Sequence, residues 1–358
     1  MKRVLSFTLT AALALSLAVP VLAAEESPFA DVPPDHWAAG AIRQAYDENI
    51  ISGIGYDQES QLAVFAPDAP LTPGQFAVIV AQAFCWREMG QDPDGPLPDN
   101  SPWYALYQRT VERAGLTEGA GIADWEAPMT RYQMAVVLYR LAERRELPLP
   151  DAAELAAVRA RIGDWDQIPE QYQQAVAACF ALGLLSGVDG AGTFAGDQTL
   201  IRAQAAAVFS KADKAIEAKD GPMERVLEKA ERDAKKDSFL VTELTRYPGR
   251  LGTAYSILQG GAPHGGNSSL RYVALDGTEL DIRSLLPEGY VYGSYWSLDP
   301  SGIQLDETGK ELSFVTRVRE QIADPAAAGG FREGKDWGDT RIVVDVVSGT
   351  VVSMDPLS

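Results

Sequence analysis

The chain repeats one helix–loop–helix pattern three times, and this triplication limits its fold more than any other feature. Each copy begins with an apolar residue, a variable residue and Asp, and then passes through a turn that contains proline. Each first helix ends in a similar phrase, at 49–53 (NIISG), 115–119 (GLTEG) and 183–187 (GLLSG). Asn or Gly at a helix end can adopt the left-handed backbone conformation. The phrase therefore predicts helix ends at Asn49, Gly115 and Gly183.

A second amphipathic helix is predicted behind each loop, after the matching phrases 71–75, 129–133 and 200–204. Thr72 and Thr130 are predicted N-caps, with Gln three residues later as in a capping box. Apolar residues then recur at i, i+3, i+4 and i+7, which places them on one helical stripe. They are Phe76, Ile79, Val80 and Ala83; Met134, Val137, Leu138 and Leu141; Ala205, Val208, Phe209 and Ala212. One unit cannot bury both of its stripes, so we expect three units to share a core around a pseudo-threefold axis.

The order F-x-D, W, G-x-x-x-G and T-R-A-Q resembles the surface-layer homology (SLH) family over roughly residues 29–217. The resemblance implies an all-α spindle of three repeats, which we name the first (25–92), second (93–150) and third (151–217) segments. It also implies non-covalent binding of a wall polysaccharide in grooves between neighbouring repeats. The typical ligand is a secondary cell-wall polymer that carries a pyruvylated amino sugar.

The resemblance assigns ligand contacts to the arginine of the T-R-A-Q phrase, which is Arg131 or Arg202 here. A guanidinium group matches a carboxylate with two parallel hydrogen bonds. The first segment has Pro73 instead, so we expect at most two competent grooves. The other ligand residues predicted are Trp37, Trp103, Asp31, Asp99, Asp164, Thr130, Gln133 and Gln204. The residues alone leave other roles open: first-turn surface charges for the arginines, core anchors for the tryptophans, and turn or cap positions for the aspartates.

The N-terminus predicts a cleaved secretory signal peptide over residues 1–24. It has a basic head, an apolar run to Leu22 and small residues before Glu25. A membrane anchor is the alternative, but the apolar run is short for a span of about 20 residues. No second stretch is apolar enough to cross a membrane. We therefore expect a secreted protein at the wall or surface of a bacterial cell.

Charge and composition exclude several partners. The net charge of -19 argues against nucleic acid, because its recognition needs a positive face. Two Cys and two His are too scattered for a metal cluster, and no cofactor is expected. Whether Cys85 and Cys179 form a disulfide is left open.

The last third of the chain changes to a β pattern, which makes the protein multidomain. Residues 218–238 predict a solvated, charged linker helix with a Glu228–Arg232 pair. Residues 239–358 predict an antiparallel, β-rich (α+β) domain with hairpin turns at 276–277, 308–309 and 348–349, and one helix near 314–322. His264 lies in a Gly-rich loop, without a recognisable nucleophile, base or metal motif beside it. The aromatic run 290–296 suits a sheet core or a sugar contact.

Three functions are compatible with this organisation. The first is a wall anchor that displays the C-terminal domain. The second is a wall-localised enzyme that acts on extracellular polysaccharide or peptidoglycan, although the sequence offers no acid–base pair and favours a non-enzyme. The third is a structural protein of an envelope or surface array, which would self-associate.

Overall fold

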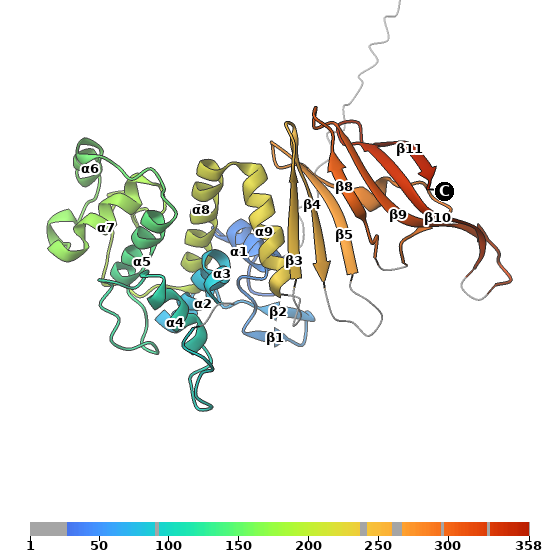
Figure 1. Cartoon of the computed structure of the whole chain (residues 1–358). Helices are drawn as coiled ribbons and strands as arrows, with labels where there is room; N and C mark the ends of the chain where they lie inside the picture. The colour runs from blue at the N-terminus through green and yellow to red at the C-terminus, as the bar shows by residue number, and fades with distance from the viewer. Residues whose placement is uncertain are drawn as a thin grey trace, which may run out of the picture.

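The computed structural model describes residues 27–89, 93–236, 242–259, 267–294, 297–327 and 330–357. The predicted signal peptide and His264 therefore lie outside the described residues. Figure 1 shows helices at one end of the molecule, strands at the other, and helix α9 (Pro222–Lys236) between them. The helical part contains α1 (Ala39–Asp47), α2 (Pro73–Phe84), α3 (Trp86–Met89), α4 (Ala105–Arg113), α5 (Arg131–Arg144), α6 (Ala152–Arg159), α7 (Glu170–Ala181) and α8 (Arg202–Asp220).

The helix boundaries that the sequence predicts are confirmed where local hydrogen bonds define them. The Gln133 amide donates to Thr130 Oγ1 over 3.3 Å, and the Thr130 amide donates to Gln133 Oε1 over 2.9 Å. Thr72 and Gln75 cap α2 in the same way. Asn49, Gly115 and Gly183 end their helices with φ values of 53°, 73° and 70°. These ends depend on neighbouring residues alone, which is why the sequence reveals them.

Replacing Thr130 by Ala should destabilise the helical part by about 1 kcal/mol, because the Gln133 amide loses its acceptor. Thr130→Ser keeps a hydroxyl oxygen at this position and should retain most of the stability. Urea unfolding followed by circular dichroism measures both values. Equal stability of the Ala and Ser variants would show that the cap contributes nothing.

The three segments meet in a closed ring of backbone hydrogen bonds. The Leu71 amide donates to the Leu200 carbonyl over 2.8 Å, the Leu200 amide to Met129 over 2.7 Å, and the Met129 amide to Leu71 over 2.8 Å. The second helix of each segment packs against the first helix of the next: α2 against α4, α5 against α7, and α8 against α1. One apolar core runs through all three segments. This cyclic exchange places residues of different segments side by side.

The helical part is not all-α, so that prediction is wrong in detail. Strands β1 (Gly55–Asp57) and β2 (Leu62–Val64) form a short antiparallel hairpin within the first segment. The Ala30 amide also donates to the Ala63 carbonyl over 2.8 Å, which ties the hairpin to the start of the segment. The hydrogen bond from Ala30, a residue far from Ala63 in the sequence, favours the extended conformation of β2.

The described residues of the C-terminal part form two antiparallel sheets. One contains, in order, β3 (Thr242–Pro248), β4 (Gly252–Gln259), β5 (Asn267–Ala274) and β6 (Glu279–Asp281). The other contains, in order, β11 (Thr350–Pro356), β10 (Phe331–Asp345), β9 (Glu311–Ala323) and β7 (Tyr290–Tyr292), and β8 (Ser301–Leu305) also pairs with β9. The predicted turns are confirmed, and Gly277, Gly309 and Gly349 have φ values of 85°, 74° and 67°.

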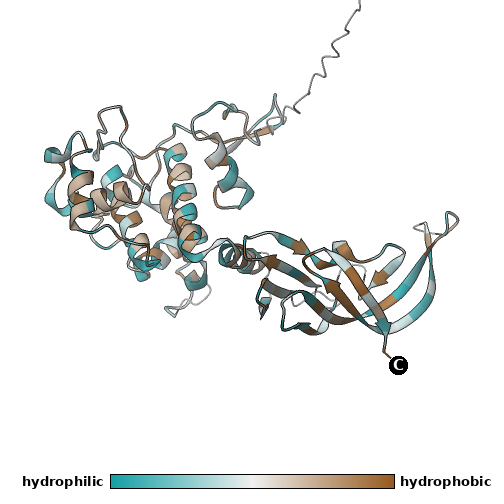
Figure 2. Cartoon of the chain, turned by 90° about the horizontal axis from the view of Figure 1, so that it is seen from above, coloured by the Kyte–Doolittle hydropathy of each residue, from teal (hydrophilic) through white to brown (hydrophobic). Residues whose placement is uncertain are grey.

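The helix predicted near 314–322 is wrong, because these residues belong to β9. Leu312, Phe314, Thr316 and Val318 are buried in strict alternation. An alternation of period two puts them on one face of a strand, where Phe314 and Val318 pack with Tyr272 of the other sheet. Figure 2 shows brown apolar and teal polar residues mixed along these strands.

Helix α9 forms as predicted, but it is not a solvated linker. Its apolar residue Leu227 packs with Tyr255 and Val273 of the β3–β6 sheet. On another face, Arg225 and Arg232 are almost completely buried. These charges have partners on distant helices, so the local sequence pattern alone could not reveal their burial.

Candidate functional site

Arg131 of the second segment reaches into the third segment. Its Nε donates to the Phe194 carbonyl over 2.8 Å and its Nη2 to the Ser186 carbonyl over 3.0 Å. The guanidinium carbon lies 5.0 Å from the centre of the Phe194 ring. Burial lowers the pKa of Arg131, and the nearby Asp164 carboxylate partly opposes that shift. Arg131 is therefore a fixed, buried cation and not an ordinary surface charge.

Arg202 of the third segment makes the same contacts with the first segment. Its Nε donates to the Phe65 carbonyl and its Nη2 to the Ser52 carbonyl, both over 2.8 Å. The Phe65 ring lies 4.7 Å from the guanidinium carbon, and burial lowers the pKa of Arg202. The two arginines thus occupy matching positions at two successive junctions between segments.

Asp31 and Asp164 hold the loops to which these arginines bind. The Asp31 carboxylate accepts from the amides of Phe65 and Ala66, over 2.8 and 2.6 Å. Asp164 accepts from the amides of Phe194 and Ala195, over 2.6 and 2.8 Å. The aspartates therefore do not cap their own helices, as the cap interpretation assumed. They bind backbone that lies about thirty residues further along the chain.

The second segment departs from this arrangement. Asp99 is exposed. The loop that corresponds to Phe65–Ala66 is held locally, because Asp124 accepts from the Glu126 amide over 2.8 Å. The Gly74 amide donates to the Trp125 carbonyl over 3.1 Å, as the Tyr132 and Ala203 amides donate to Gly196 and Pro67 at the other two junctions. What this junction lacks is the arginine side chain, because Pro73 takes its position.

One groove of about 380 Å³ opens where all three segments meet. Trp37 contributes an indole that is 63% exposed, and Arg131 lies in the groove wall. The remaining wall comes from the third segment, through the 184–188 loop and α8 residues that include Gln204 and Lys211. The groove therefore combines an aromatic face, two cationic side chains and an amide.

Lys211 is a site residue that the sequence analysis missed. It follows Gln204 and Ala207 along the side of α8 that lines the groove, next to the apolar stripe at Val208. Burial and, secondarily, the positive charge of Arg131 lower the pKa of Lys211. An anion in the groove would relieve this repulsion. Its position seven residues, or two helical turns, after Gln204 was the available signal in the sequence.

The structure brings only part of the predicted site together. Trp37, Arg131 and Gln204 share the groove. Trp103 is 67% exposed and packs edge-on against Tyr104, with ring centres 5.7 Å apart. The other predicted residues do not line this groove and have the positions given above: Arg202, Asp31, Asp99, Asp164, Thr130 and Gln133.

The junction without an arginine is closed by apolar packing. Pro73 lies at the position that corresponds to Arg131, beside Trp125 and Val137, around a cavity of about 10 Å³. This volume has room for about one water molecule.

The described residues contain no group of three His, Cys, Asp or Glu side chains that could hold a metal ion. Cys85 and Cys179 are buried free thiols, which answers the question of their pairing. Burial raises the pKa of the Cys85 thiol to about 12, so it is a poor nucleophile. Among the helices in the described ranges, none combines the length and apolar character needed to span a membrane.

Comparison with known proteins matches two stretches of the helical part to a domain family. The S-layer homology domain model matches residues 28–77 and 161–206. The S-layer protein of Bacillus thuringiensis subsp. finitimus is 31% identical over 121 residues, which are 34% of this chain and 14% of that protein. The S-layer protein sap of Bacillus anthracis is 30% identical over 121 residues, again 34% and 14%. A cell surface protein of Thermoanaerobacter kivui is 26% identical over 131 residues, or 37% and 15%.

The matched part thus spans about one seventh of the length of these relatives. The first matched region contains Trp37 and ends within α2, and the second contains Arg202 and ends within α8. Arg131 lies between the two. The chain therefore matches S-layer homology domains at two regions, residues 28–77 and 161–206, and proteins similar to it include S-layer proteins of Bacillus.

Proposed function

We propose that the helical part is a three-repeat SLH spindle that anchors this protein to an acidic polysaccharide of the bacterial cell wall. The groove formed by Trp37, Arg131 and Lys211 is the observation that carries the proposal, because each residue comes from a different segment. The ring of hydrogen bonds among Leu71, Met129 and Leu200 supports three equivalent repeats. The SLH match and the S-layer relatives point to the cell surface or cell wall.

The groove suits a sugar that carries a carboxylate. Arg131 is held by two backbone carbonyls through Nε and Nη2, so little side-chain entropy is lost when a ligand binds. Lys211 adds a second cation, and the exposed Trp37 indole offers an apolar face for a sugar ring. The volume of about 380 Å³ falls within the usual range of ligand pockets. A pyruvyl ketal supplies the required carboxylate on a compact sugar.

We expect a weaker second groove at the Arg202 junction. The repeat alignment pairs Lys211 with Gln82 and Trp37 with Trp103. The second groove would therefore have one cation where the first has two. The Pro73 junction would bind no ligand, because it lacks the arginine and is filled by apolar side chains.

Binding of the whole mature chain to purified cell walls, with and without the accessory polymer, tests this function. Lys211→Ala and Trp37→Ala should each weaken binding at least about tenfold, since each removes a contact worth roughly 1.4 kcal/mol or more. Lys214→Ala is the matched control, because Lys214 is an exposed lysine on the same helix. It should bind like the unmodified protein.

Arg131→Ala is a less clean test, because it also leaves the Phe194 and Ser186 carbonyls without their donor. Thermal unfolding of each variant separates lost binding from lost structure. Binding by the Lys211→Ala/Trp37→Ala double variant at the level of Lys214→Ala, or equal binding to walls stripped of polymer, would refute the proposal.

A surface-array protein is the second candidate, because the relatives named above include S-layer proteins. This function requires the mature chain to self-associate. Light scattering across a range of protein concentrations decides between the two: a constant monomer mass favours the anchor, and concentration-dependent growth favours an array.

A further inference from the structure

Helix α9 presents a set of charged side chains to the helical part, and the largest of them are buried. Arg225, Glu228 and Arg232 are 2%, 6% and 1% exposed. Charged residues are almost never this deeply buried unless they are paired. Their partners therefore show which elements α9 holds together.

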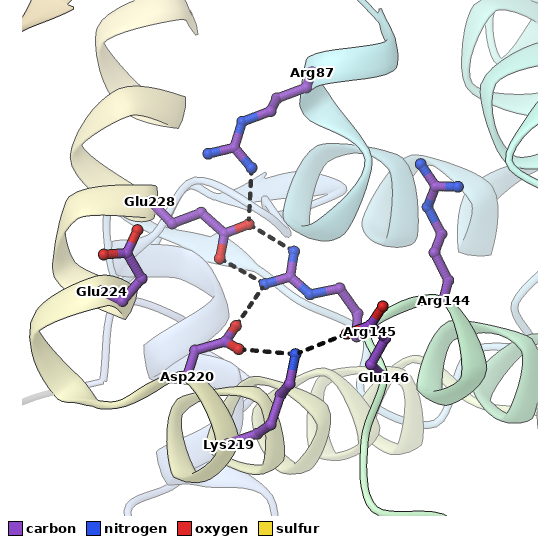
Figure 3. A pocket seen from close by; sticks show the side chains of 8 residues that line it. All are labelled: Arg87, Arg144, Arg145, Glu146, Lys219, Asp220, Glu224 and Glu228. Carbon is purple, nitrogen blue, oxygen red and sulfur yellow. Dashed lines mark hydrogen bonds and ion pairs between the residues drawn. The ribbon is translucent and has the colours of Figure 1, made fainter.

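The Glu228 carboxylate joins α9 to α5 and α3. Arg145, which directly follows α5, donates from Nη1 to Oε1 and from Nη2 to Oε2, both over 2.7 Å. Arg225 of α9 donates to Oε2 over 2.6 Å, and Arg87 of α3 lies 3.6 Å from Oε1. Figure 3 shows Arg145 between Glu228 and Asp220, with interactions drawn to both. One carboxylate thus faces three guanidinium groups.

A second set of ion pairs joins α9 to α8 and α1. Asp213 of α8, which is 1% exposed, accepts from Arg225 Nε over 2.8 Å and from Lys229 Nζ over 2.9 Å. Lys229 and Arg232 also contact Glu48, the residue after α1, over 2.9 and 3.2 Å. With the Glu228 contacts, α9 is bonded to helices of the first, second and third segments.

Another face of α9 contacts the β-rich part. Leu227 is buried against Tyr255 and Val273 of the β3–β6 sheet. Glu224 pairs with Arg246 of β3 over 2.5 Å. In Figure 1, α9 accordingly lies between α8 and the strands β3, β4 and β5.

We infer that α9 is a clamp that closes the three helical segments and fixes the β-rich part to them as one rigid body. Parts of a chain that share only a small interface are expected to move relative to each other. Here one face of α9 packs in an apolar cluster with the β3–β6 sheet, and another face forms buried ion pairs with the helical part. If the proposed wall binding holds, the β-rich part has a fixed orientation relative to the polymer.

Glu228 is the position at which to test the clamp. Glu228→Gln preserves the shape of the side chain but removes the charge that Arg145, Arg225 and Arg87 share. A buried ion pair that loses one partner leaves an uncompensated charge, which is strongly unfavourable. Glu146→Gln is the matched control, since the Glu146 side chain lines a pocket together with Glu228 (Figure 3) and is 85% exposed.

The experiment compares rotational correlation times of the helical and β-rich parts from ¹⁵N relaxation on the full mature chain. The unmodified protein and Glu146→Gln should give one common value for both parts. Glu228→Gln should give two distinct values, and hydrogen exchange of the α9 amides should become at least tenfold faster. Independent tumbling in the unmodified protein, or an unchanged Glu228→Gln variant, would overturn the inference.

A second variant loosens the clamp from its other face. Leu227→Ala removes the side chain that packs on Tyr255 and leaves every ion pair to the helical part in place. It should also separate the two correlation times, while α9 exchange stays slow. This test applies even if Glu228→Gln fails to fold, and a common correlation time in Leu227→Ala would then reject the clamp.

Discussion

A helical part that ends after Asp220 should unfold at least about 6 °C below one that ends after Lys236. Without α9, Asp213 and Glu48 lose Arg225, Lys229 and Arg232. Removing one partner of a buried ion pair costs about 3–5 kcal/mol. For a domain of this size, each kcal/mol lowers the melting temperature by roughly 2–4 °C. Thermal unfolding of the two fragments, followed by circular dichroism, measures the difference.

The longer fragment exposes Leu227, which normally packs on the β-rich part. Its melting temperature should therefore be compared with that of a Leu227→Lys version, in which the exposed apolar surface is reduced. Equal melting temperatures for the fragments that end at 220 and 236 would show that α9 does not stabilise the helices. The predicted unit boundary at residue 217 excludes α9, and we propose that the stable unit extends through this helix.

Acid should remove a large part of the stability, through Glu228. Burial would raise the pKa of this carboxylate, but the hydrogen bonds and charges of Arg145 and Arg225 outweigh burial and lower the pKa from 4.5 to about 2. Because the pKa is lower in the folded state, the stabilisation is complete above about pH 4.5 and is lost as the pH falls towards 2. A shift of this size corresponds to on the order of 3 kcal/mol. Asp213 contributes in the same direction, since Arg225 and Lys229 outweigh its desolvation and lower its pKa.

Urea unfolding between pH 7 and pH 2.5, over the range in which the proteins remain folded, tests this prediction. Glu228→Gln should be less stable at pH 7, and the difference from the unmodified chain should shrink as the pH falls. Glu146→Gln should follow the unmodified chain at every pH. Parallel curves for Glu228→Gln and the unmodified chain would rule out Glu228 as the source of the acid sensitivity.

Alignment of the three repeats identified only some of the residues and contacts of the candidate groove. Alignment selected Arg131 and Arg202 correctly as equivalent positions, and both make the same pair of backbone contacts. It could not show that Asp31 binds a loop about 35 residues away, or that Lys211 lies beside Arg131. The first relationship joins the start of one segment to its own loop, and the second arises where the three segments meet.

Local features were determined by the sequence alone. The capping box of Thr130 and Gln133, the helix end at Asn49 and the hairpin turn at Gly277 each involve residues only a few positions apart. Their hydrogen bonds and backbone angles hold whatever surrounds them. The continuation of strand β9 through residues 314–322 was missed, because a short run of mixed apolar and charged residues suits a helix or a strand until its pairing partners are known.

Tertiary structure decided the groove and the role of α9. Glu228 pairs with Arg145 across 83 positions, and Arg232 pairs with Glu48 across 184. A charged helix next to water and a charged helix buried among opposite charges have the same sequence pattern. Only the positions of those distant partners make α9 a buried junction, because the cost of desolvating its charges is offset by their ion pairs.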